Sequence, residues 1–173
     1  MLLAILSDSH DNLPNLHAAL DYCAQAKIAT LLHCGDLANA ETLQAVVERF
    51  TGDVHLVAGN ADYDVAAFQT LSTSRRHLHF YGDVGQLSTE AGKIAWCHHP
   101  QLARTLAATG RYIAVFYGHT HRPWEEAVGT CQLINPGTIA GTFHRPTFAV
   151  YDTAAAQAQL ILVDQLHGLK YMR

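Results

Sequence analysis

Short apolar segments that end in polar residues alternate with amphipathic segments over the first third of the chain, and this alternation constrains the fold most. Residues 2–6, 30–33 and 54–58 are predicted strands, since each is a short apolar run that stops at polar residues. Residues 13–25 and 40–50 are predicted helices, because their apolar side chains recur every three or four positions. This β-α-β-α-β order predicts parallel strands, right-handed crossovers and helices outside the sheet.

The remainder of the chain is richer in strands. One further helix is predicted at residues 101–108, before Gly110, and residues 62–76 are expected to form a loop. The predicted strands are 77–81, 85–90, 94–97, 112–117, 125–128, 131–134, 147–152 and 157–163. Two sheets packed face to face with helices outside accommodate this pattern. No linker divides the chain, so we expect a single domain over residues 1–173, with a terminal tail at 165–173.

The predicted strands of the first third end in side chains that can bind metal ions. Asp8 and His10 follow the first strand. Asp36 follows the second strand, and Asn60 follows the third. Because the carboxyl ends of parallel strands meet at one edge of a sheet, where open α/β sheets bind ligands, we expect these side chains to lie together.

Two later strands end in histidines, namely His98 and the tetrapeptide Gly118-His119-Thr120-His121. Residues two apart at a strand exit can point the same way, so we expect His119 and His121 to converge on one region. A D-x-H triplet is common by chance, at about 0.7 copies for this composition, but G-N-x-D and G-H-T-H are expected at only about 0.02 and 0.005 copies. The series therefore indicates a metal site rather than coincidental polar loop ends.

The donor set combines two aspartates, one asparagine and four histidines: Asp8, Asp36, Asn60, His10, His98, His119 and His121. Mixed nitrogen and oxygen ligands without thiolate suit Mn²⁺, Fe, Ni²⁺ or Zn²⁺. Seven ligands exceed the needs of one tetrahedral ion, whereas sharing Asp36 makes two sets of four. Two cations about 3.5–4 Å apart activate water and stabilise an in-line displacement at phosphorus, so a phosphate ester is the expected substrate.

In this order the motifs resemble those of the calcineurin-like metallophosphoesterase superfamily, and more narrowly its small prokaryotic phosphodiesterases. The resemblance implies an α/β fold with four αββα layers, in which two mixed β-sheets pack as a sandwich flanked by helices. It also implies a dinuclear centre that attacks phosphorus with a metal-bridging hydroxide. The implied ligands are Asp8, His10, Asp36 and His121 for one ion, and Asp36, Asn60, His98 and His119 for the other. Asn135-Pro136-Gly137-Thr138 matches a family loop near the site, and Asp11 and Asn12 complete the first motif.

Two positions depart from the family pattern. Ala61 stands where much of the wider superfamily has a histidine that protonates the leaving group or binds phosphate, although the small phosphodiesterases commonly lack it. His99 stands where a glycine is usual. It either faces solvent, or supplies the missing acid or a phosphate contact. We therefore take Asp36, Asn60 and His99 as candidate catalytic residues, and expect weak action on esters with poor leaving groups.

The expected function is hydrolysis of phosphodiesters by an enzyme with two divalent ions per chain, with Mn²⁺ expected and Ni²⁺, Fe or Zn²⁺ as alternatives. One alternative is a phosphomonoesterase or pyrophosphatase with the same centre. Another is a non-catalytic scaffold, since the fold also resembles the small subunit of the endosomal retromer complex. The complete ligand set favours the enzyme over the scaffold.

The composition indicates which classes of partner the chain can bind. A net charge of −4 without a basic stripe argues against binding of duplex nucleic acid and favours a small phosphodiester. Four scattered cysteines without a C-x-x-C pair, and the lack of a targeting or membrane segment, predict a cytoplasmic protein that does not bind membranes. Whether the chain forms a homo-oligomer stays open.

Overall fold

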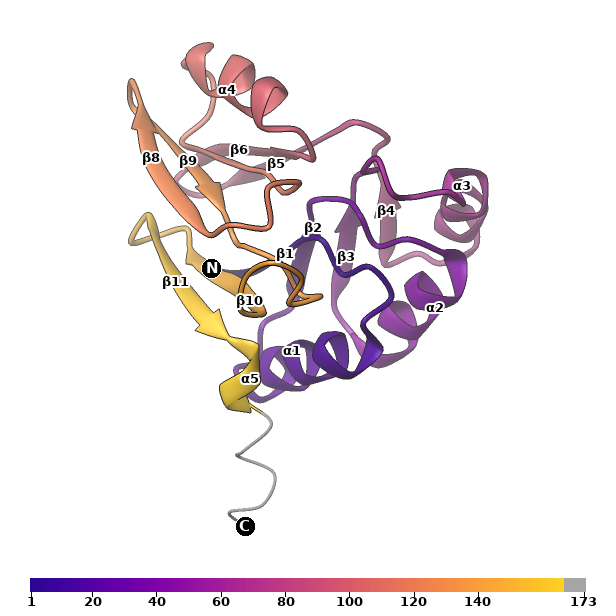
Figure 1. The fold of residues 1–173 in the computed structure, drawn as a ribbon. Coiled ribbons are helices and arrows are strands. Elements are labelled where there is room, and N and C mark those ends of the chain that lie inside the picture. The colour runs from indigo at the N-terminus through magenta and orange to yellow at the C-terminus, as the bar shows by residue number, and fades with distance from the viewer. Residues whose placement is uncertain (167–173) are drawn as a thin grey trace.

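Six strands form the first sheet of the computed structural model, which describes residues 1–166 (Figure 1). The strand order is β11-β10-β1-β2-β3-β4. Their bounds are β1 Leu2–Leu6, β2 Thr30–His33, β3 Asp53–Leu56, β4 Leu78–Phe80, β10 Thr147–Asp152 and β11 Gln157–Leu162. Strands β1 to β4 are mutually parallel, whereas β10 pairs antiparallel with both β1 and β11. The first sheet is therefore mixed, with the expected parallel unit at its centre.

Five strands form the second sheet, in the order β5-β6-β7-β9-β8. Their bounds are β5 Val84–Thr89, β6 Gly92–Cys97, β7 Ala114–Phe116, β8 Trp124–Val128 and β9 Cys131–Asn135. Strands β6, β7 and β9 run parallel, and β5 and β8 are antiparallel edges. Both sheets thus have parallel strands whose carboxyl ends can share one site.

Helices cover the outer faces of both sheets. Their bounds are α1 Leu13–Gln25, α2 Ala40–Arg49, α3 Val65–Ser74, α4 Pro100–Ala108 and α5 Val163–Leu166. Four of them, α1, α2, α3 and α5, contribute to the core on the outer side of the first sheet, and α4 packs on the second sheet. Alternate strand residues, such as Leu3 and Ile5 of β1, point inward and meet Trp96 and Phe116 between the sheets. These layers confirm the expected αββα fold.

Two segments differ from the sequence-based expectation. Residues 62–76 do not form only a loop, since they contain α3. Its sequence is rich in Ser and Thr, only Phe68 is buried, and Asp64 makes no capping hydrogen bond, so the usual helix signals are weak. Strand β11 ends at Leu162, and α5 occupies part of the expected tail, whose residues 167–173 lie outside the described residues.

His55 of β3 is a buried histidine that lies between the sheets, against Trp96. The Nδ1 atom of His55 lies 2.8 Å from the hydroxyl of Tyr81, and its ring stacks on His79 and meets the edge of Trp96. Burial, and secondly the neighbouring His79, lower the pKa of His55 to about 4 from 6.5. The native protein therefore holds this imidazole neutral at neutral pH.

This histidine should make the stability depend on pH. The unfolded chain binds the proton near pH 6.5 and the native protein only near pH 4, so the free energy of unfolding falls as pH decreases through this window. Between pH 7 and pH 5 the loss from this group should be about 2 kcal/mol. In urea titrations, His55→Gln should show a loss smaller by that amount. Exposed His144→Gln serves as the control, and equal pH slopes for wild type and His55→Gln would contradict this prediction.

Candidate metal centre

The seven predicted donors lie on loops that leave the carboxyl ends of five strands. Asp8 and His10 follow β1, and Asp36 follows β2. Backbone hydrogen bonds hold these loops together, with the amide of Asp8 donating to the carbonyl of Gly35 (3.1 Å) and that of His10 donating to Asp36 (3.1 Å). The remaining donors are Asn60 after β3, His98 after β6, and His119 and His121 after β7. The two sheets therefore bring their donors to one region.

Asp8, His10 and His121 form one cluster of side chains close enough to share a metal ion. The two histidine Nε2 atoms lie 3.2 Å apart, and His121 Nε2 lies 3.2 Å from Asp8 Oδ1. His10 Nε2 also lies 3.7 Å from Asp36 Oδ2. His121 donates from Nδ1 to the carbonyl of Thr142 (3.3 Å), which leaves Nε2 free to act as a ligand.

Asn60, His98 and His119 form the second cluster. Asn60 Oδ1 lies 2.9 Å from His98 Nε2 and 2.7 Å from His119 Nδ1. His98 Nε2 lies 3.3 Å from His119 Nδ1 and 3.4 Å from Asp36 Oδ2. His119 and His121 therefore belong to different clusters of the same region, which is the division that the family resemblance implies.

The Asp36 carboxylate lies between the two clusters. Its Oδ1 accepts a hydrogen bond from the amide of Ala61 (2.7 Å), while Oδ2 lies within 3.7 Å of His10 Nε2 and 3.4 Å of His98 Nε2. Burial alone would raise the pKa of Asp36, but the hydrogen bond with His98 and the amide of Ala61 hold it below its usual value. The carboxylate is thus ionised at neutral pH, with one oxygen facing both clusters.

The donor chemistry of the second cluster fits a cation. His98 donates from Nδ1 to the carbonyl of Cys34 (2.8 Å), so the lone pair of a neutral ring is at Nε2, facing the oxygens of Asn60 and Asp36. Acceptors directed at one point repel each other unless a metal ion or a proton lies between them. Separations near 3 Å suit two ligands of one ion with bonds of about 2.0–2.2 Å. Without a metal, a proton on His98 Nε2 takes this place. Burial alone would lower the pKa of His98, but Asp36 raises it.

Strained backbone places most of these donors. Asp8, His10, Asp36, His119 and His121 have φ values of 52°, 40°, 56°, 70° and 58°. This left-handed region is uncommon for residues other than glycine, and such strain clusters at functional sites. Asp, Asn and His tolerate it better than most residues, so the residue types suit both the conformation and the chemistry. The sequence offered no signal for this backbone geometry.

Residues 1–156 match the calcineurin-like phosphoesterase superfamily domain. The chain belongs to this superfamily. The match covers all seven donors and confirms the family that the motif order indicated. Membership in this metallophosphoesterase superfamily implies divalent metal ions, and the clusters around Asp8 and His98 are candidates to hold them.

Individual members of the superfamily show which of its proteins the chain resembles. The chain is 26% identical over 167 residues to a phosphodiesterase of Methanocaldococcus jannaschii, covering 95% of this chain and 100% of that protein. The solved structure of an archaeal phosphodiesterase superposes with a TM-score of 0.86 at 26% identity, over 94% of this chain and 99% of that one. Vps29 of Entamoeba histolytica has a TM-score of 0.66 at 18% identity, over 94% and 99% of the two chains, which shows a common fold alone.

Asp62 connects the loops that follow β2 and β3. Its buried carboxylate accepts hydrogen bonds from the amides of Asp36 (3.0 Å), Ala38 (2.7 Å) and Gly59 (2.7 Å). At Gly59 a Cβ atom would lie 2.2 Å from Asp36 Oδ1, so only glycine permits this approach of the two loops. Asp62 therefore positions the loops after β2 and β3, and it belongs to neither cluster of candidate ligands.

Further polar contacts support the loops after β1 and β7. Asn135 donates from Nδ2 to the carbonyl of Gly118 (2.8 Å), and the Thr138 hydroxyl donates to the carbonyl of Asp8 (2.9 Å). The loop that begins at Asn135 thus lies beside the site, as its family motif implies. Buried His33 hydrogen-bonds through Nε2 to the hydroxyl of Ser9 (2.7 Å), which lies between two donors in the sequence. This hydrogen bond ties the loop after β1 to the end of β2.

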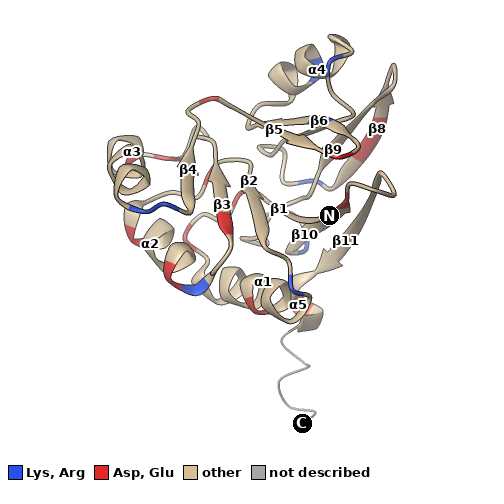
Figure 2. Cartoon of the chain, turned by 180° about the vertical axis from the view of Figure 1, so that it is seen from behind, with Lys and Arg blue, Asp and Glu red and all other residues tan. Residues whose placement is uncertain are grey.

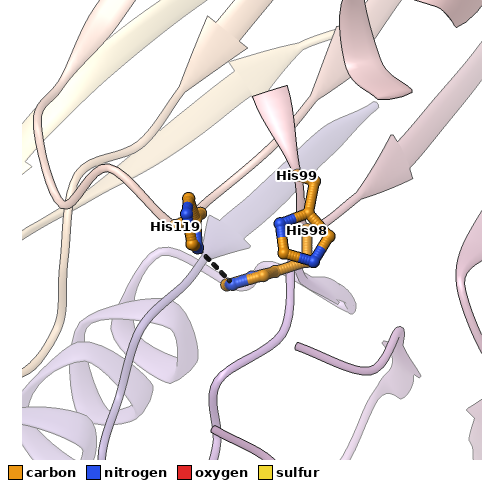
Figure 3. Close-up of side chains that lie close together, drawn as sticks. All are labelled: His98, His99 and His119. Atoms are coloured by element: carbon orange, nitrogen blue, oxygen red, sulfur yellow. Dashed lines mark hydrogen bonds between the residues drawn. The ribbon is translucent and has the colours of Figure 1, made fainter. Parts of the chain in front are cut away.

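His99 lies exposed beside the second cluster (Figure 3). Its ring centroid is 5.0 Å from that of His98 and 4.9 Å from that of His119. Burial, and then the neighbouring His98 and His119, lower its pKa. A ligand bound at the second cluster can therefore reach a neutral imidazole here.

Within residues 1–166, no helix combines the length and the apolar character needed to cross a bilayer.

Proposed function

We propose that this chain is a phosphodiesterase with a dinuclear divalent-metal centre, built within a single domain over residues 1–173. The observation that supports it is the position of Asp36 Oδ2, within 3.7 Å of His10 Nε2 and 3.4 Å of His98 Nε2. One ion would bind Asp8, His10, Asp36 and His121, and the other Asp36, Asn60, His98 and His119. Mn²⁺ is the proposed metal, and the donor set also suits Ni²⁺, Fe and Zn²⁺.

When bound, the two cations would supply a hydroxide nucleophile near neutral pH and stabilise negative charge on the phosphoryl group. The chain's own contribution is to hold the donors in place. Carbonyl groups of Cys34 and Thr142 accept from the Nδ1 atoms of His98 and His121, which fixes the ring orientation and the tautomer. Asp8 and Asp36 carry two negative charges against four on the ions, so an anionic phosphate would be attracted.

The site offers little to protonate the leaving group. Ala61 has no proton to give, and His99, whose pKa is lowered, is mostly neutral near pH 7. Esters with good leaving groups need little protonation, so activated diesters should react faster than alkyl esters. The name of the archaeal relative supports a diester as substrate.

The charge distribution supports a small substrate. Along the described part of the chain, Figure 2 shows short Lys and Arg segments interspersed with Asp and Glu segments. Duplex nucleic acid is held mainly by phosphate contacts with basic stripes. The free state of all four cysteines also supports the proposal of a reducing, cytoplasmic environment.

Metal reconstitution tests this function. Metal-stripped protein should not hydrolyse bis-p-nitrophenyl phosphate, and Mn²⁺ or Ni²⁺ should restore turnover as about two ions bind per chain. Comparison with p-nitrophenyl phosphate separates the alternatives, because a diesterase should prefer the diester by about tenfold or more. A preference for the monoester would favour the phosphomonoesterase. Two bound ions without any turnover would favour the interaction scaffold.

A further inference from the structure

Phe143 is an exposed aromatic side chain on strained backbone. Its side chain is 89% exposed, and its φ of 66° lies in the left-handed region. That conformation is a genuine outlier for a bulky residue, and exposing the ring gains nothing for stability. A strained, exposed ring next to a candidate site points to a function in binding.

The loop that carries Phe143 is hydrogen-bonded to residues of the first cluster of candidate ligands, Asp8 and His121. The carbonyl of Thr142 accepts from His121, and the ring centroid of Phe143 lies 5.9 Å from that of His121. In the same loop, the amide of Ala140 donates to the carbonyl of Asp8 (3.0 Å). The backbone is thus held at the site while the ring of Phe143 stays open to a ligand.

The geometry of an in-line displacement gives this ring a partner. A phosphodiester carries two ester groups, and the leaving group departs opposite the nucleophile. The retained ester group lies in the plane of the other phosphorus substituents, and is therefore directed sideways, towards the rim of the site. Exposed aromatic rings bind planar rings such as nucleobases by stacking.

We propose that Phe143 is a specificity-determining residue that stacks on a planar ring in the retained ester group. This inference rests on the proposed diesterase function, and it names the substrate class as small phosphodiesters of nucleosides or similar heteroaromatic alcohols. A long nucleic acid strand is a poorer fit, because the guanidinium of Arg145, two residues further along the chain, is paired with Asp164 (2.9 and 3.0 Å).

Two substrates with the same leaving group test this proposal. Thymidine 5′-(p-nitrophenyl phosphate) and ethyl p-nitrophenyl phosphate both release p-nitrophenolate and differ only in the retained group. The wild type with Mn²⁺ should favour the thymidine ester in kcat/KM by about 5- to 150-fold, mainly through KM. Phe143→Ala should bring this ratio close to one. Phe143→Leu, which keeps the apolar volume without a planar face, should lose most of the preference, and Phe143→Trp should keep it.

The ratio separates stacking from a structural effect, since a misplaced His121 would slow both esters alike. Leu160→Ala, an exposed apolar side chain on the edge strand β11, is the matched control and should leave the ratio unchanged. A wild-type ratio near one, or the same ratio in Phe143→Ala, would overturn the inference while the diesterase function stands. Hydrolysis of neither ester by the metal-loaded wild type would overturn both.

Discussion

Asp36→Asn is expected to lower Mn²⁺-dependent hydrolysis of bis-p-nitrophenyl phosphate by about 100- to 1000-fold. The Oδ2 atom of Asp36 faces His10 of one cluster and His98 of the other, at 3.7 and 3.4 Å. An asparagine fills the same volume but brings a neutral amide, so it removes the negative charge that two cations would share. Metal analysis should show the bound ions falling from about two to about one per chain.

The matched control for this substitution is Asp53→Asn. Asp53 is an exposed carboxylate on β3 that faces His79 rather than the donor clusters. It should keep both ions and hydrolyse the diester within about threefold of the wild type. If Asp36→Asn also keeps two ions and this rate, the shared-carboxylate arrangement is wrong.

Asp62→Ala is expected to lower the free energy of unfolding by about 3–5 kcal/mol. The substitution leaves the buried amides of Asp36, Ala38 and Gly59 without their acceptor. Buried donors without a partner are costly, and a loss of this size is a large part of the stability of an ordinary domain. Because the same amides fix the loops after β2 and β3, metal affinity should fall as well. Urea unfolding and metal titration measure the two effects.

Two further variants isolate the role of Asp62. Asp62→Asn keeps one acceptor oxygen and should lie between the wild type and Asp62→Ala in both measurements. Asp64→Ala removes a neighbouring carboxylate that makes no capping hydrogen bond, and should change the free energy of unfolding by less than about 1 kcal/mol. A similarly small change in Asp62→Ala would contradict its assignment as the link between the loops.

Much of the fold could be predicted because local patterns report burial. Apolar runs ending in polar residues marked the strands that lead to Asp8 and Asp36, and three- and four-residue spacing marked helices α1 and α2. Helix α3 escaped this reasoning because it buries one side chain, Phe68, and therefore has little apolar periodicity. The order of the strands also escaped it, since pairing between distant segments leaves no local pattern.

The sequence by itself predicted which donors the candidate site has, because all seven follow predicted strands and three of them stand in motifs that chance rarely supplies, G-N-x-D and G-H-T-H. Their division into two sets was implied by the family resemblance and not by the spacing of the residues, and only the tertiary structure gives its physical reason. His119 and His121 are two residues apart, yet left-handed backbone at both turns the first towards His98 and the second towards His10. The exposed position of Phe143 was equally hidden. Torsion angles in loops, and the packing of one sheet on the other, decide which atoms meet, and neither is encoded in the spacing of residues along the chain.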